Sequence, residues 1–248
     1  MPFRDRADAG KSLALKLTAY ANRSDVVVVA LPRGGVPVAF EVARALHAPL
    51  YVIVVRRLEA SADGEVTIGA VGDGVVVIDE ALVKALGLSD TAVQEAVQRE
   101  QREIARRESL YADYRISDLA GRTVIIVDDG VATGSSMGAA VAVIEARRPS
   151  GIVVAVPVDS DVAYVKPASR LQEDVYLYAR NPVYPISLWY EDYRPVTDEE
   201  ACKLLREARM RDQAVKFSPE HYRELAADPT ANREQAFEQR GFPARGPR

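Results

Sequence analysis

Short apolar runs rich in β-branched residues recur along this chain, separated by turns and by segments with helical spacing. Runs of this length that are apolar at every position are typical of strands covered on both faces. Because strands and helices alternate, the pattern predicts an α/β fold, a doubly wound parallel sheet of about five strands. The runs occupy residues 26–31, 51–55, 123–127, 151–156 and 175–179.

A different pattern follows the second of these runs. Residues 66–71 and 75–78 are apolar segments around a Gly-rich turn, which predicts a β-hairpin. Ser89 and Asp90 then open the longest predicted helix, over about 89–112. We interpret its basic residues as a solvated face paired with glutamates of the same helix, in preference to a phosphate-facing role. These residues are Arg99, Arg102, Arg106 and Arg107.

Residues 181–198 bring together several aromatic side chains, close to Glu191 and Asp192. Aromatic faces are good stacking surfaces for a planar heterocycle, so Trp189, Tyr190 and Asp192 are candidate acceptor contacts. The alternative is a packed aromatic hairpin that closes the core. Thr197 opens a capping box that predicts a helix through about residue 211. We therefore expect one domain over 1–211 and a polar, partly disordered extension over 212–248.

The composition is that of a globular protein, with 48% hydrophobic and 27% charged residues among 248. A net charge of −4 argues against bulk attraction to nucleic acid or to an anionic membrane. The single cysteine, Cys202, cannot form an internal disulfide. No apolar run approaches the length of a membrane span and no export signal is evident, so we expect a cytoplasmic protein.

Two carboxylates end the third apolar run, where a parallel strand would emerge at the ligand-binding edge of its sheet. Asp128 and Asp129 can accept hydrogen bonds from a vicinal diol, or hold Mg²⁺ directly or through water. The small and hydroxyl-bearing loop that follows leads into a helix over about 137–147, a ready anion site. Its residues are Gly130, Val131, Ala132, Thr133, Gly134, Ser135 and Ser136. The alternative is a Rossmann-like strand that ends in a chance turn.

A second anion-site pattern follows the first apolar run. Arg33, Gly34 and Gly35 precede a helix over about 36–46, so backbone N–H groups can approach a ligand and the guanidinium can match phosphate oxygens. Arg56 and Arg57 end the predicted strand over 51–55. They either neutralise a diphosphate leaving group or pair with acidic surface residues.

Residues 124–136 match without a gap the signature of the type I phosphoribosyltransferases: four apolar residues, two acidic ones, then a small Thr-rich loop. The chain resembles that family over roughly residues 3–210. The resemblance implies that Asp128 and Asp129 contact the ribose 2- and 3-hydroxyls and that the loop binds the 5-phosphate of phosphoribosyl pyrophosphate. Residues 33–35 resemble the family's pyrophosphate loop, which often contains a cis peptide, and Arg33 would stabilise the departing pyrophosphate.

The resemblance also implies Mg²⁺ as cofactor, a mobile lid over about 57–80, a hood over about 181–196 that grips the acceptor, and a homodimer. The expected reaction transfers the phosphoribosyl group to an unidentified acceptor, a planar nitrogen heterocycle or nucleobase. A specialised-metabolite acceptor, a non-catalytic ligand sensor on the same fold, and hydrolysis or ring transfer from a nucleotide are the alternatives. A general base is not identifiable; Glu65, Asp159 and Asp192 are available.

Overall fold

A computed structural model describes residues 2–60, 66–116, 118–131, 134–159, 170–179 and 185–216, and for 214–216 the backbone alone. Residues Met1–Arg209 form one compact unit. Its centre is a five-stranded, fully parallel sheet with strand order β2-β1-β6-β7-β8, which confirms the predicted fold class. The strands are β1 (Val26–Ala30), β2 (Leu50–Val52), β6 (Thr123–Val127), β7 (Gly151–Asp159) and β8 (Leu171–Ala179).

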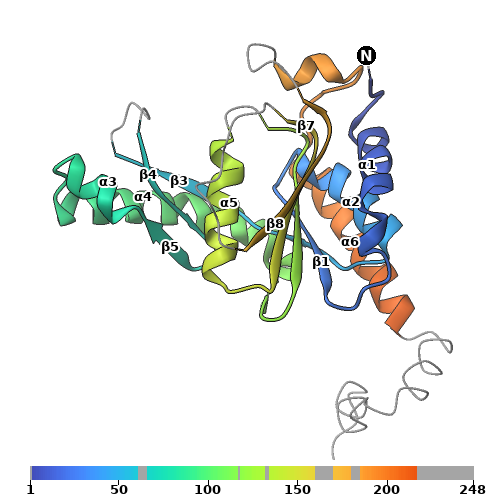
Figure 1. The fold of residues 1–248 in the computed structure, drawn as a ribbon, viewed down its shortest axis with the longest axis horizontal. Helices are drawn as coiled ribbons and strands as arrows, with labels where there is room; N and C mark the ends of the chain where they lie inside the picture. Colours follow the sequence, from blue (N-terminus) through green and yellow to red (C-terminus); the bar gives the residue numbers. More distant parts are fainter. Residues whose placement is uncertain are drawn as a thin grey trace, which may run out of the picture. The chain divides into compact units, whose positions relative to one another are not determined.

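Helices cover both faces of this sheet, which explains why its central strands are apolar at nearly every position (Figure 1). Alternate β6 residues point to opposite sides: Ile125 and Val127 pack in one apolar cluster, Val124 and Ile126 in the other. The first cluster lies under α1 (Arg6–Ala14), α2 (Gly35–Leu46) and the start of α6 (Asp198–Lys216). The second lies under α5 (Ser135–Ala146). A short 3₁₀ helix, η1 (Leu15–Tyr20), follows α1.

A second, antiparallel sheet departs from the prediction for residues 51–55. Strand β2, at one edge of the central sheet, ends at Val52, and β3 (Val55–Glu59) begins a separate sheet with β4 (Thr67–Gly72) and β5 (Val75–Ile78). Ile53 and Val54, which connect the two sheets, are both buried, so the apolar pattern shows no break there. The predicted hairpin is confirmed, and its turn residues Asp73 and Gly74 have φ of 51° and 76°, as a two-residue hairpin turn of the primed type requires.

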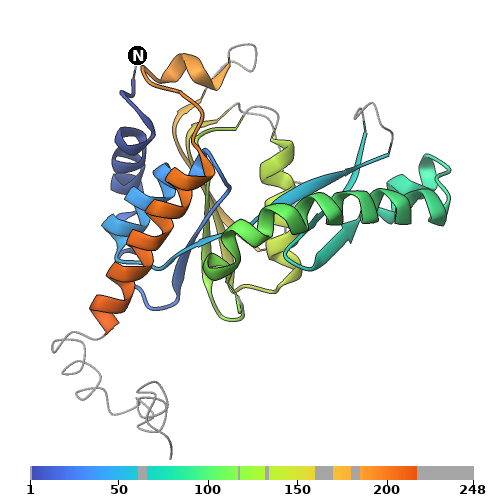
Figure 2. The same cartoon turned by 180° about the vertical axis from the view of Figure 1, so that it is seen from behind.

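The second sheet is covered by α4 (Asp90–Glu108), a helix of 19 residues. After a short α3 (Glu80–Ala85), α4 starts at an N-cap in which Ser89 accepts from the Ala92 N–H, and a 3₁₀ turn η2 (Ser109–Tyr114) follows. α4 packs along β3 and β4 (Figure 2). The segment expected to be a lid, 57–80, is thus, in its described residues, mostly a folded sheet between α4 and α5. Glu65 lies outside the described residues.

The stretch expected to be a hood begins, as far as it is described, with η3 (Ile186–Trp189) and continues as a loop into α6. A single β-bridge joins Tyr190 of this stretch to Phe3 near the N-terminus. The extension predicted over 212–248 lies outside the described residues beyond 216. Within the described part of the chain, no helix has the length and apolar character needed to span a membrane.

Candidate functional site

The acidic pair at the end of β6 divides into two different environments. Asp128 is partly buried and lines two cavities, whereas Asp129 is only 8% exposed and lines neither. The Asp129 backbone N–H donates to Asp128 Oδ1 at 2.9 Å, which fixes the direction of the Asp128 carboxylate. Burial, and then the neighbouring charge of Asp129, raise the pKa of Asp128 above the usual aspartate range. The two carboxylates therefore lie in separate environments, and only that of Asp128 borders a cavity.

Arg6, which the sequence did not single out, is the partner of Asp129. Arg6 Nε donates to Asp129 Oδ2 at 2.8 Å, and the two side chains are 10% and 11% exposed. Arg6 Nη1 also donates to the Arg194 carbonyl at 2.8 Å, and the guanidinium lies 4.1 Å from the ring centre of Tyr193. Burial opposes the charge of Arg6, but Asp129 outweighs it and raises the pKa of the guanidinium. Asp129 is thus held in a buried ion pair.

Tyr190 also contacts Asp129, through the Asp129 backbone. Its hydroxyl donates to the backbone carbonyl of Asp129 at 2.6 Å, and the residue is 2% exposed. Its ring packs against Phe3 and Tyr193, with centroid distances of 5.4 and 5.1 Å. The ring offers no free face for stacking, so the structure corrects its assignment as an acceptor contact and favours the packed aromatic alternative.

The two other acceptor candidates are also engaged within the protein. Trp189 is partly buried and packs on Tyr178, with ring centroids 5.3 Å apart. Asp192 is exposed and accepts from the backbone N–H of Arg194 at 3.0 Å. Neither residue lines a cavity that Asp128 lines.

The Arg-Gly-Gly loop lies directly against the acidic pair. A Cβ atom on Gly34 would stand 2.3 Å from Asp129 Oδ2, and one on Gly35 would stand 2.7 Å from the Val127 carbonyl. Only glycine permits so close an approach of backbone to carboxylate. The peptide between Pro32 and Arg33 is cis. The Arg33 side chain is half-exposed, with Nη1 3.6 Å from Asp198 Oδ2.

The hydroxyl-rich loop after the acidic pair forms the smaller cavity, of about 130 Å³. Gly134, with φ of 74°, is the N-cap of α5, so the first N–H groups of that helix open toward the loop. Ala132 and Thr133 lie outside the described residues. The lining residues are Asp128, Gly130, Val131, Gly134, Ser136, Met137 and Ile186. The predicted anion loop and the carboxylate are therefore brought together.

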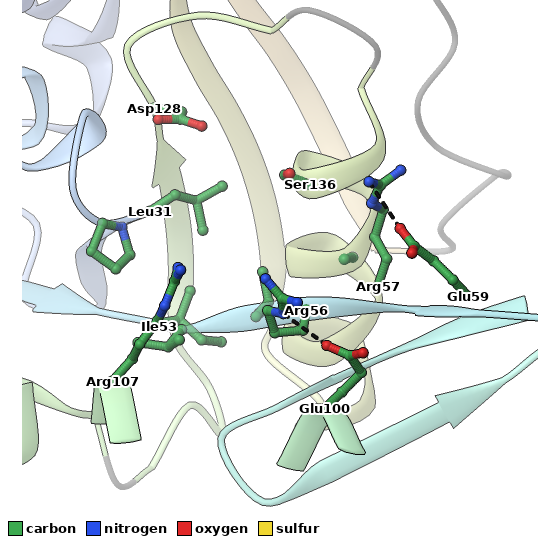
Figure 3. A pocket seen from close by; sticks show the side chains of 13 residues that line it. Leu31, Ile53, Arg56, Arg57, Glu59, Glu100, Arg107, Asp128 and Ser136 are labelled. Carbon is green, nitrogen blue, oxygen red and sulfur yellow. Dashed lines mark hydrogen bonds and ion pairs between the residues drawn. The ribbon is translucent and has the colours of Figure 1, made fainter. Parts of the chain in front are cut away.

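The larger cavity, of about 310 Å³, lies between the sheet edge, α5 and the second sheet (Figure 3). Arg56 and Arg57 both line it, although they lie within β3 and not at the end of a central strand as predicted. Arg56 Nε donates to Glu100 Oε2 at 2.8 Å, and Arg57 is 3.0 Å from Glu59 and donates to Ser135 Oγ at 3.2 Å. Both arginines thus pair with acidic residues, as the second alternative expected, and both also line the cavity.

Glu100, on α4, also lines this cavity. It is 6% exposed and also accepts from Arg99 Nε at 3.0 Å. Burial opposes its charge, but the hydrogen bonds from Arg56 and Arg99 prevail and lower the pKa of the carboxyl. Glu100 thereby stays ionised and fixes the direction of Arg56.

The side chains around the acidic pair offer few ligands for a magnesium ion. Among the described residues no three His, Cys, Asp or Glu side chains converge to hold a metal ion. Mg²⁺ commonly keeps several waters and is held by one or two carboxylates together with substrate phosphates. Asp128, which forms no ion pair within the described part of the chain, fits that mode, whereas Asp129 is committed to Arg6.

Residues 4–178 match the family model of the phosphoribosyl transferase domain, so this chain belongs to that family. A solved structure, TT1426 from Thermus thermophilus, is 37% identical, covers 84% of this chain and 99% of its own, and superposes with a TM-score of 0.74. The Mycobacterium tuberculosis H37Rv protein named "Putative phosphoribosyl transferase Rv0571c" is 39% identical over 236 residues, 94% of this chain. The matched region is 52% of that protein, so the chain spans about half the length of this relative.

Proposed function

We propose that this protein binds phosphoribosyl pyrophosphate and transfers its 5-phosphoribosyl group to an acceptor with release of pyrophosphate. The observation that carries the proposal is the position of Asp128, a carboxylate without a cationic partner in the described residues that lines both a small loop cavity and an arginine-lined cavity. A sugar with a phosphate at one end and a diphosphate at the other fits that order of groups.

The smaller cavity takes the 5-phosphate in this proposal. The N–H groups at the start of α5 and the Ser136 hydroxyl supply donors, and the helix dipole favours the anion. Asp128, when ionised, accepts hydrogen bonds from the ribose hydroxyls. Because the pKa of Asp128 is raised, this interaction weakens on acidification at a higher pH than for an ordinary aspartate.

The larger cavity takes the diphosphate. Arg57 reaches the loop through Ser135 and also lines this cavity, so its charge lies between the two phosphate-bearing ends of the donor. Arg33 can turn from Asp198 to the leaving group, since that pair is long and half-exposed. Cations placed where negative charge develops stabilise the transition state more than the ground state. Asp129 acts indirectly on the bound donor, because its carboxylate packs against the Gly34 backbone and so positions the Arg-Gly-Gly loop.

Asp128 would hold Mg²⁺ together with oxygens of the donor. When bound, the ion would neutralise charge on the diphosphate.

Turnover is the test. Protein, Mg²⁺ and phosphoribosyl pyrophosphate are incubated with a panel of nucleobases, other nitrogen heterocycles and amines, and pyrophosphate release is measured beside the Asp128→Asn variant. Acceptor-dependent release that the variant loses supports the proposal. Donor binding without release for any acceptor would favour the ligand-sensor alternative, and release at equal rates by wild type and variant would refute the assignment of Asp128.

A further inference from the structure

The larger cavity has a third cation that the fold brings in from the long helix. Arg107 lines it together with Arg56 and Arg57. Arg107 and Glu100 are seven residues apart on α4, two helical turns, and so share one face of the helix. That face borders the cavity, so Arg107 lines a cavity as well as belonging to the exposed surface expected for the α4 arginines.

The three cations differ in how far their charge is already compensated. Arg56 is paired with the nearly buried Glu100, and Arg57 with Glu59. Arg107 forms no ion pair or hydrogen bond within the described part of the chain, and it is exposed. Figure 3 shows its side chain rising from α4 toward Ile53 and Leu31, on the side of the cavity that leads to Asp128. An uncompensated guanidinium in a concave, arginine-lined space is suited to a multiply charged phosphate.

We propose that Arg107 is a binding residue for the diphosphate group, so that α4 supplies a cation to the donor site alongside Arg57 of β3. The inference rests on the proposed function and adds a residue and an element to it. Arg56 differs in role, because its charge is neutralised by Glu100 and its side chain is held in place as part of the cavity wall. The ligand class is a phosphate ester or anhydride with at least two adjacent phosphates, since no residue of α4 lines the smaller cavity proposed for the 5-phosphate.

Arg106 provides a matched control. It is the preceding residue of the same helix, is also exposed, carries the same charge and does not line the cavity. Replacing either arginine by alanine changes the net charge of the protein equally, so a difference between the two variants reports position and not bulk electrostatics. Circular dichroism melts establish that both variants are folded.

The experiment is calorimetric titration of wild type, Arg107→Ala and Arg106→Ala with two probes in Mg²⁺ buffer, inorganic pyrophosphate and ribose 5-phosphate. We expect Arg107→Ala to bind pyrophosphate about 10- to 100-fold more weakly, the usual effect of losing a hydrogen bond to a charged group. Its affinity for ribose 5-phosphate should be unchanged. Arg106→Ala should match wild type with both probes, and Arg107→Lys should recover part of the loss.

Equal pyrophosphate affinity of the two alanine variants would overturn the role of Arg107. So would wild-type protein that binds ribose 5-phosphate but not pyrophosphate, and in that case the sugar-phosphate part of the proposed function would stand. Wild-type protein that binds neither probe would overturn both. Loss of ribose 5-phosphate binding in Arg107→Ala would show a general disturbance of the site, and the specific assignment would fall.

Discussion

The buried ion pair between Arg6 and Asp129 makes the two adjacent aspartates separable by mutation. Asp129→Asn keeps the shape of the side chain but leaves the Arg6 guanidinium, whose side chain is 10% exposed, without a counter-charge. Asp128→Asn is the matched control. It removes the same charge at the preceding residue, and the Asp128 carboxylate has no cationic partner in the described structure. The first variant should lose stability, and the second should not.

Removing one partner of a buried ion pair typically destabilises a protein by about 3–5 kcal/mol. Arg6 retains the Arg194 carbonyl and the Tyr193 ring, and an asparagine oxygen can still accept from Nε. We therefore expect about 2–3 kcal/mol, slightly below the general range. For a unit of this size, about 2–4 °C per kcal/mol gives a fall in Tm of about 4–12 °C.

Asp128→Asn has the opposite expected sign. A carboxyl whose pKa is raised in the folded state is destabilising when it is ionised, so replacing it by a neutral amide leaves Tm unchanged or raises it. Differential scanning calorimetry at neutral pH measures both variants. A double-mutant cycle with Arg6→Met should show that the combined variant is less unstable than the sum of the single changes. A Tm for Asp129→Asn within about 2 °C of wild type would refute the buried-pair reasoning.

Three further changes test other parts of the site. Gly34→Ala places a Cβ 2.3 Å from Asp129 Oδ2, so we expect the free energy of unfolding to fall by about 1–3 kcal/mol and donor binding to weaken. Urea unfolding and calorimetric titration curves that match wild type would contradict this expectation. Glu100→Gln should lower the free energy of unfolding by about 1–2 kcal/mol at pH 7. This difference in stability from wild type should vanish as the pH falls through the lowered pKa of Glu100. A difference that does not change with pH would be inconsistent with the Arg56 and Arg99 contacts. Tyr190→Phe removes the hydrogen bond to the buried Asp129 carbonyl, so the free energy of unfolding should fall by about 1–2 kcal/mol. An unchanged free energy of unfolding would mean that the hydroxyl binds water instead.

The strand that carries the acidic pair could be predicted because its residues are apolar on both faces and end abruptly in two carboxylates. The loop cavity followed from the same local pattern, since Gly134 and the start of α5 are neighbours in sequence. Local signals of this kind need no knowledge of the rest of the fold.

Long-range partners were not predictable in the same way. Arg6 lies 123 positions before Asp129, and nothing in its own segment distinguishes it from the other charged residues of an amphipathic helix. The break between β2 and β3 was not predictable because Ile53 and Val54, which connect the two strands, are apolar and buried like the strand residues on either side of them. The seven-residue spacing of Glu100 and Arg107 was the one available signal for the cavity-facing side of α4, but helical spacing alone does not say which face meets solvent.

Binding of the phosphoribosyl donor at Asp128 is the central element of the proposed function. Calorimetric titration of phosphoribosyl pyrophosphate into wild-type protein, Asp128→Asn and Arg106→Ala, each with and without Mg²⁺, tests it in one series. We expect Mg²⁺-dependent binding to wild type and to Arg106→Ala, and an affinity at least about tenfold weaker for Asp128→Asn, whose Tm is not lowered. Absence of binding to wild type at millimolar donor, or equal affinity of wild type and Asp128→Asn, would contradict it.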